Sequence, residues 1–235
     1  MKITEKLKMT NGDIAKYGPI TIVAFGDSVT HGILTLNEIS YETVYWNRLR
    51  KKILEIRDQI PVNVINSGIE GFAASQSIER MDSQVLAHNP DLVIVCFGLN
   101  DVFGELDKYL GALKTIFEKI QASGADLIFM TPNMMNTSLA EDTPSIWFET
   151  AKKTLEKQNS GTMDLSMDSA VKLAKDMGVK VCDCYSKWKE LSKTQDVTYL
   201  LANRINHPSR EMHELFAQSL FDIIFEGEDL QSFKK

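Results

Sequence analysis

Four short polar or glycine-rich turns in this 235-residue chain carry the residue types that acyl transfer requires. They are Gly26-Asp27-Ser28, Asn66–Gly71, Gly98-Leu99-Asn100-Asp101 and Asn206-His207-Pro208. Acyl transfer needs a hydroxyl nucleophile, an imidazole base and N–H donors that face the developing oxyanion. Ser28 offers the hydroxyl and its own backbone N–H, and Gly71 and the Asn100 side-chain amide are the candidate second and third donors.

The turn around Ser28 supports two interpretations when it is taken alone. It follows an apolar, β-branched stretch at residues 20–25, and serine is a common N-cap of the helix that comes next. The neighbouring Asp27 can accept backbone hydrogen bonds and hold the turn. Donors and a base beside Ser28 favour a nucleophile, because a helix cap has no use for them.

Elimination among the four histidines favours His207 as the base. His88 precedes an Asn-Pro pair at the start of a strand, which is the opposite edge of a sheet. His31 lies one helical turn after the serine, where it can line a pocket, and His213 falls within the last helix as a packing or capping group. His207 sits in a loop before a proline that opens this helix, so its ring is free to face the sheet edge.

Alternating strands and helices predict a doubly wound α/β fold with a five-stranded parallel sheet and helices on both faces. The expected strands are residues 20–25, 62–66, 91–97, 127–131 and 179–182. The expected helices are residues 42–59, 73–88, 103–122, 165–177, a short one around Trp188, and 209–225. Because the carboxyl ends of parallel strands meet at one edge, this fold would bring the four turns together.

We expect a single domain over residues 1–235, with an irregular insertion at about 132–160 that is a candidate substrate-facing segment. This insertion carries Met134, Met135, Trp147 and Phe148. These side chains either form the wall of an acyl or sugar pocket or pack locally as core.

Composition argues against several classes of function. The net charge of −6 gives no electrostatic footprint for nucleic acid or an anionic membrane. No stretch approaches the ~20 apolar residues of a membrane span, and residues 1–17 lack the apolar region of a signal peptide. Three cysteines in apolar surroundings favour reduced thiols and a cytoplasmic location, and Cys182-Asp183-Cys184 lacks the second pair of a metal site. We therefore expect no metal and no organic cofactor, while the oligomeric state stays open.

The four turns resemble, in order, blocks one, two, three and five of the SGNH, or GDSL-type, esterases and lipases. The resemblance extends over about residues 18–225. It implies a flavodoxin-like sheet ordered 2-1-3-4-5 and ester hydrolysis through a Ser–His pair. It also implies Ser28 as nucleophile, His207 as base, and Gly71 and Asn100 as oxyanion donors. Asp27 and Asp101 belong to the same blocks and are expected to support the site.

One position departs from the family pattern. An aspartate usually stands three residues before the histidine and orients the imidazole, but Arg204 stands there in this chain. Arginine cannot accept the imidazole N–H. Three explanations follow: a backbone carbonyl of residues 203–206 orients the ring, Asp183 after the fifth strand does so, or the orienting group is weak or absent.

The leading hypothesis is a serine esterase that acts on a small-molecule ester, with short acetyl esters on carbohydrate as the preferred substrate. The resemblance also allows a lysophospholipase or thioesterase. The missing aspartate allows a weakly active or non-catalytic carbohydrate- or acyl-binding protein on the same scaffold. A nucleotide or flavin binder is discounted, because the first turn has neither G-x-G-x-x-G nor a P-loop lysine.

Overall fold

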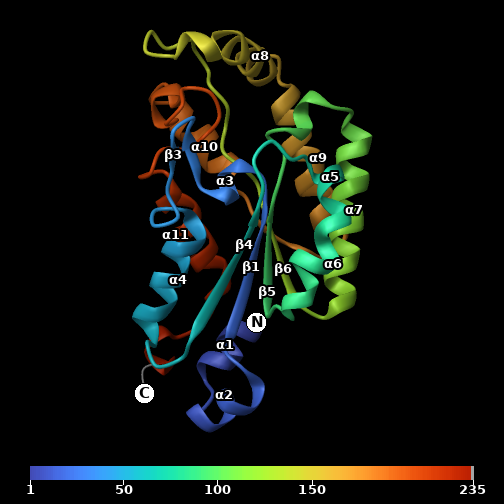
Figure 1. Ribbon diagram of the computed structural model, residues 1–235, viewed down its shortest axis with the longest axis vertical. Helices are drawn as coiled ribbons and strands as arrows, with labels where there is room; N and C mark the ends of the chain where they lie inside the picture. The colour runs from blue at the N-terminus through green and yellow to red at the C-terminus, as the bar shows by residue number, and fades with distance from the viewer. Residues whose placement is uncertain (234–235) are drawn as a thin grey trace.

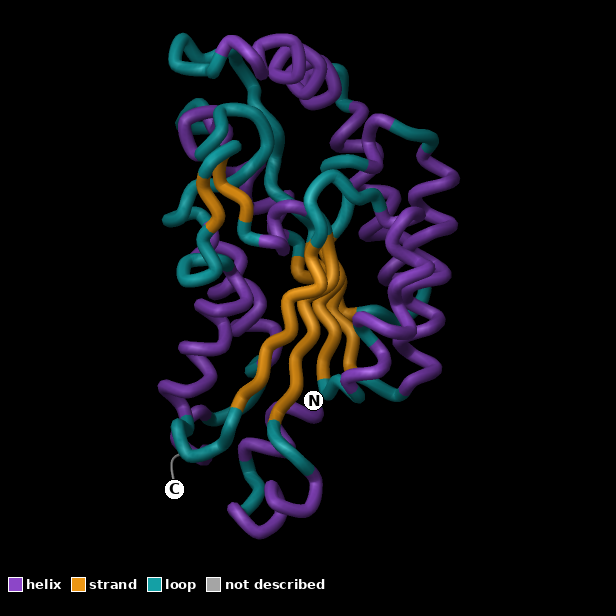
Figure 2. The backbone as a smooth tube through the Cα atoms, in the orientation of Figure 1, coloured by secondary structure: helices purple, strands orange, loops and turns teal. Residues whose placement is uncertain are grey.

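Five parallel strands form the central sheet of the computed structural model, which describes residues 1–233 (Figures 1 and 2). Along the chain they are β1 (Ile20–Gly26), β4 (Val62–Gly68), β5 (Leu92–Cys96), β6 (Asp126–Met130) and β7 (Lys180–Cys182). Their order across the sheet is β4-β1-β5-β6-β7, which is 2-1-3-4-5 when these five strands alone are counted. The predicted α/β fold and strand order are confirmed.

The central strands β1 and β5 are almost wholly apolar because helices cover both faces of the sheet. All five residues of β5 are buried, as expected for a central parallel strand. Helices α4 (Tyr45–Ile56), α10 (Cys184–Ser192) and α11 (His213–Ile224) lie on one side, and α7 (Leu106–Ser123) and α9 (Thr162–Asp176) lie on the other (Figure 1). The buried apolar side chains of both layers belong to one contiguous core.

The expected helix at residues 73–88 is broken into short pieces. These are α5 (Ala74–Ser77), a 3₁₀ turn at Ile78–Arg80, α6 (Met81–Gln84) and a 3₁₀ turn at Leu86–His88. Arg80 lies at the break and turns inward, where its guanidinium donates to the carbonyls of Gly26 (3.2 Å) and Ser67 (2.7 Å). The predicted continuous helix was wrong here, and the inward arginine holds the carboxyl ends of β1 and β4 together.

Several small elements add to the main strands and helices that the sequence predicts. Residues before β1 form two short helices, α1 (Lys2–Leu7) and α2 (Asn11–Tyr17). After the one-turn helix α3 (Ser28–His31), a hairpin of β2 (Ile33–Thr35) and β3 (Glu38–Ile39) projects beside the carboxyl edge of the sheet (Figure 2). None of the helices in residues 1–233 has the length and apolar character that crossing a membrane requires.

The segment at residues 132–160 begins without regular structure and ends as a helix. A 3₁₀ turn at Ser145–Trp147 leads into α8 (Phe148–Asn159), which lies across the carboxyl end of the sheet (Figure 1). Met134 and Met135 are buried in the core, whereas Trp147 lines a cavity at this edge. Phe148 is 38% exposed and has neither role, so three of the four large apolar side chains divide between the two roles that the sequence allowed.

Candidate active site

A cavity of about 260 Å³ opens at the carboxyl edge of the sheet, where the four turns converge. Ser28, Gly71, Asn100 and His207 all line it. The other lining residues are Ile33, Thr35, Leu36, Glu70, Trp147, Thr150, Asn203, Ile205 and Asn206. The fold therefore brings into one cavity the side chains and the glycine that the sequence singled out from four separate turns.

Ser28 is the first residue of α3, and its hydroxyl is not used as a helix cap. The cap is Asp27, whose Oδ1 accepts a hydrogen bond of 3.0 Å from the N–H of Val29. The Ser28 side chain is 4% exposed and its Oγ lies 2.9 Å from Nε2 of His207. A serine hydroxyl paired with an imidazole in this way can transfer its proton to the ring.

The Ser28 turn packs closely against the end of β4. A Cβ added to Gly68 would lie 2.3 Å from the backbone nitrogen of His31, so only glycine allows α3 to approach this strand. Gly71, three residues after the end of β4, has a φ of +75°, a conformation that favours glycine. Its surroundings are open, since no atom lies within 4 Å of an added Cβ. The backbone at Gly71 can therefore approach a bound substrate.

Asn100 keeps one of its two amide hydrogens available. Its Nδ2 donates a hydrogen bond of 3.1 Å to the carbonyl of Phe72, which fixes the amide beside Gly71. A side-chain amide has two N–H donors, so the second can serve a ligand in the cavity. The same contact ties the turn after β5 to the turn after β4.

The loop that carries His207 is organised by one side chain. Oδ1 of Asn203 accepts hydrogen bonds of 3.0 Å from the backbone N–H groups of Ile205, Asn206 and His207. The carbonyl of His207 in turn accepts a hydrogen bond of 2.8 Å from the N–H of Ala202. These contacts fix the backbone at His207 without any contact to its ring.

No carboxylate among residues 1–233 forms a hydrogen bond with Nδ1 of the imidazole. Nδ1 of His207 is buried and has no hydrogen-bond partner among the described residues. Asp183 instead caps α10, accepting from the N–H and hydroxyl of Ser186, and it also accepts from the Thr131 hydroxyl. The expected acceptor carbonyl within residues 203–206 is not in contact with Nδ1 either. The backbone of Leu34, in the hairpin of β2 and β3, acts as a weak acceptor for the ring and raises the pKa of His207, although Nδ1 forms no full hydrogen bond with it.

Arg204 faces away from the imidazole. It adopts a left-handed conformation with a φ of 61°, and its guanidinium forms a bidentate ion pair with Asp142 at 2.9 to 3.1 Å. It also donates to the carbonyl of Leu201 at 2.8 Å. The residue that replaces the usual acid therefore joins the His207 loop to the segment that leads to Trp147.

Burial keeps His207 neutral. Loss of solvation lowers the pKa of this imidazole to about 4, and the backbone of Leu34 only partly opposes the shift. At neutral pH the ring is therefore unprotonated, as a proton acceptor must be. Nε2 is the atom that faces the Ser28 hydroxyl.

Two buried carboxyl groups, of Asp27 and Asp101, are the chain neighbours of the cavity residues Ser28 and Asn100. Burial raises the pKa of Asp27 to about 7, with a further contribution from the negative charge of Asp101, and burial also raises the pKa of Asp101 to about 6. Oδ1 of Asp101 accepts from the N–H of Ala74 at 2.9 Å. The second oxygen of each group is buried without a partner among residues 1–233. Both aspartates thus hold the turns of Ser28 and Asn100 through one oxygen each.

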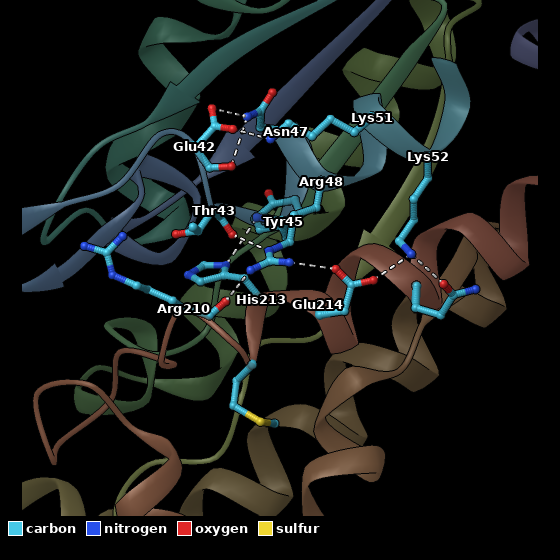
Figure 3. Close-up of polar contacts among 12 residues, drawn as sticks. Glu42, Thr43, Tyr45, Asn47, Arg48, Lys51, Lys52, Arg210, His213 and Glu214 are labelled. Carbon is cyan, nitrogen blue, oxygen red and sulfur yellow. Dashed lines mark hydrogen bonds and ion pairs between the residues drawn. The ribbon is translucent and has the colours of Figure 1, made fainter. Parts of the chain in front are cut away.

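Contacts between α4 and α11 fix the far end of the His207 loop (Figure 3). Arg48 donates to the carbonyl of Arg210 at 3.1 Å and forms an ion pair with Glu214 at 2.9 Å. The buried His213 accepts a hydrogen bond of 3.3 Å at Nδ1 from the N–H of Tyr45. His213 therefore has the packing role predicted for it, and its contact anchors the helix that follows the loop.

Sequence reasoning missed Arg80 and Asn203, which position the site without entering the chemistry. From sequence alone, an arginine within a helical pattern is expected to be exposed to solvent. Asparagine is common in loops, so its presence at residue 203 did not stand out. Within residues 1–233, no group of three or more histidine, cysteine or acidic side chains is arranged to hold a metal ion. The three cysteines are buried and free, and Sγ of Cys182 lies 3.6 Å from Sγ of Cys184.

Solved structures show the same fold. An acetylxylan esterase from Geobacillus stearothermophilus, Axe2, is 21% identical, with a TM-score of 0.68 over 91% of this chain and 96% of that one. The acetyl xylan esterase AlAXEase is 20% identical, with a TM-score of 0.68 over 87% and 100% of the two chains. A putative GDSL-like lipase from Parabacteroides merdae is 18% identical, with a TM-score of 0.70 over 92% and 97%.

The family is identified from the sequence itself. No curated protein matches the chain closely enough to add a relative. The GDSL-like lipase/acylhydrolase family, however, matches residues 24–215, which is most of the chain and includes all four turns. The chain therefore belongs to the GDSL-like lipase/acylhydrolase family of ester hydrolases.

Proposed function

We propose that this hydrolase cleaves short-chain acyl esters through a Ser28–His207 dyad. The observation that carries the proposal is the 2.9 Å contact between Oγ of Ser28 and Nε2 of a buried, neutral His207. Ser28 Oγ attacks the ester carbonyl carbon while Nε2 takes its proton. The tetrahedral oxyanion accepts hydrogen bonds from the N–H groups of Ser28 and Gly71 and from the free amide hydrogen of Asn100.

The acyl-enzyme forms and is hydrolysed with the same proton carrier. Collapse of the first intermediate breaks the bond to the alcohol, which leaves with the proton held on Nε2 of His207. Water then attacks the acyl carbon and gives its proton to Nε2. When the second intermediate collapses, that proton returns to Ser28 Oγ and the carboxylic acid is released.

Backbone rigidity replaces the orienting acid in this proposal. The loop fixed by Asn203 sets the direction of the ring, and the backbone of Leu34 is the group nearby that favours the imidazolium formed during the reaction. Catalytic mutants of the similar Axe2 replace a serine, a histidine and an aspartate. The chain keeps counterparts for the first two and, with Arg204, lacks the third, so we expect turnover slower than that of an enzyme with a complete triad.

Acetyl esters of carbohydrate are the substrates that the cavity suits best. Its volume of about 260 Å³ accommodates a small acyl group with part of an alcohol, and its lining mixes Trp147 with asparagine and threonine side chains. The similarity to two acetylxylan esterases supports the same substrate class. The three free, buried cysteines are consistent with the cytoplasm as the place of action.

The lack of a hydrogen-bond partner for Nδ1 of His207 among the described residues favours a second candidate function. A protein that binds an acylated carbohydrate without cleaving it needs no orienting acid, and Nδ1 of His207 has no partner among residues 1–233. Turnover distinguishes the two candidates, since the binding protein would hold the ester without releasing its alcohol.

Hydrolysis of p-nitrophenyl acetate tests the proposal. The wild type should turn over, and Ser28→Ala and His207→Ala should each lower kcat by at least about 10³-fold. Ser83→Ala is the matched control, because Ser83 lies on α6 and does not line the cavity. An inactive wild type, or a Ser28→Ala variant that keeps its activity, would falsify the dyad. Mass mapping of a fluorophosphonate label should independently find Ser28.

A further inference from the structure

The cavity contains one charge that the reaction does not use. Glu70, at the turn after β4, is the single acidic residue in the lining, which holds no lysine or arginine and whose His207 is neutral. The Glu70 side chain is exposed and makes no hydrogen bond or ion pair with another residue of 1–233. Its carboxylate is therefore available to a ligand.

The nearby cations are already neutralised by other partners. Arg204 is held in the bidentate ion pair with Asp142, and Arg210 on the hairpin side is paired with Glu38. Neither arginine lines the cavity. The site consequently presents a net negative charge to an entering molecule, and an anionic alcohol group would meet repulsion without compensation.

Trp147 adds an aromatic surface to the same cavity. The indole lines the cavity as Glu70 does, and it lies at the start of α8, where the ion pair of Arg204 and Asp142 ties the preceding segment to the His207 loop. An indole face attracts organic cations, and the attraction is larger when a carboxylate is close enough to act on the same cation. The Glu70 carboxylate and the Trp147 indole therefore both favour a positively charged ligand.

We propose that Glu70 is a specificity-determining residue that makes this site prefer esters whose alcohol is cationic over neutral isosteres and reject anionic ones. This inference rests on the proposed function for the position of the alcohol, because the acyl group is held at Ser28 and the oxyanion donors. The alcohol then extends toward Glu70 and Trp147. Amino-sugar and amino-alcohol esters belong to the favoured class, whereas uronate and phosphate-bearing esters belong to the rejected one.

Binding of alcohol analogues tests the preference without any need for turnover. The probes are choline chloride and its uncharged isostere 3,3-dimethylbutan-1-ol, titrated at matched ionic strength. The indole N–H signal of Trp147 in ¹⁵N-labelled protein reports binding. We expect choline to bind about three- to tenfold more tightly, as a partly screened unit charge a few ångströms away implies. The ratio should fall toward one in Glu70→Gln and in 0.5 M salt.

A matched control removes the same charge elsewhere. Glu79 is exposed, unpaired among the described residues and outside the cavity lining, so Glu79→Gln should keep the wild-type ratio. Equal binding of the two probes by the wild type, or an unchanged ratio in Glu70→Gln, overturns the inference. A p-nitrophenyl acetate assay on the same samples reports separately on the dyad, so the two proposals can fail independently.

Discussion

Ser28 and His207 are 179 residues apart in the chain, yet Oγ of one and Nε2 of the other lie 2.9 Å apart. Ser28 lies directly after the carboxyl end of β1. His207 lies in a loop whose backbone is held by Asn203. The opposite ring nitrogen, Nδ1, is left without a partner among residues 1–233. The proposed proton acceptor is thus positioned by the backbone of its own loop, without a carboxylate among the described residues.

Asn203 should control the rate because it holds the His207 loop. Asn203→Ala removes the acceptor for three backbone N–H groups, so the imidazole loses its fixed position. We expect kcat to fall by about 10- to 100-fold, since small misplacements of a catalytic group have effects of this size. Asn203→Asp keeps the acceptor oxygen and should retain more activity than the alanine variant. Equal loss in both variants would show that the acceptor is not what matters.

The pH dependence of kcat/KM should show an acid limb with a midpoint near pH 4. Burial lowers the pKa of His207 to about 4, and only the neutral ring can accept the proton of Ser28. Activity should therefore be lost as the pH falls through about 4 and should be level by pH 6. A stopped assay with a neutral ester measures the profile. A limb near pH 6.5 would contradict this expectation and would imply a partner that stabilises the imidazolium.

Asn100→Ala should lower kcat by about 10²- to 10³-fold, the usual effect of removing one oxyanion donor. The expected change is in kcat more than in KM, because the amide serves the charge that develops during the reaction. Asn100 also holds the carbonyl of Phe72, so the thermal midpoint of the variant must be compared with that of the wild type. A variant with wild-type kcat would remove Asn100 from the oxyanion site.

The ion pair of Arg204 and Asp142 should affect substrate binding and leave the dyad intact. Arg204→Gln and Asp142→Asn should each raise KM a few-fold, because both release the segment that carries Trp147. A double-mutant cycle should give a coupling of up to about 1 kcal/mol, as expected for a partly exposed pair. Arg204→Asp should not raise kcat, since a side chain at this position points toward Asp142. A gain in kcat from that variant would contradict the observed direction.

His213 should make the protein less stable in acid. Burial lowers its pKa to about 3, so protonation favours the unfolded chain. The stability that neutral His213 provides is complete above the unfolded-state pKa of about 6.5 and is lost as the pH falls toward 3. Chemical denaturation at several pH values measures this slope, up to about 1.4 kcal/mol per pH unit for one proton. His213→Gln should be less stable at pH 7 but less sensitive to acid.

Local patterns were sufficient to predict the strands and the turns that follow them. Buried parallel strands are almost wholly apolar, so β1 and β5 stand out, and polar residues directly after them mark the ligand-binding edge. What failed depended on contacts distant in sequence. The inward turn of Arg80 breaks a regular helical pattern, and only the folded sheet supplies the carbonyls that it binds.

The sequence around Arg204 also could not predict where its side chain points. Its partner, Asp142, is 62 residues away, and neither residue type distinguishes an ion pair from a solvated charge. The hairpin of β2 and β3 was missed because its strands of three and two residues are too short to show a period. Arg204 makes no contact with the imidazole, and the hairpin places the backbone of Leu34 beside it, so the sequence could identify His207 but not what surrounds its second nitrogen.

The wide separation of Ser28 and His207 along the chain also bears on when activity can arise during synthesis. The serine is in the first strand of the sheet and leaves the ribosome early, whereas the histidine follows the fifth strand and directly precedes the last long helix. A nascent chain can pair its first strands while it still lacks the histidine. The proposed dyad therefore cannot form until residue 207 has been synthesised and its loop has reached the carboxyl edge of the sheet.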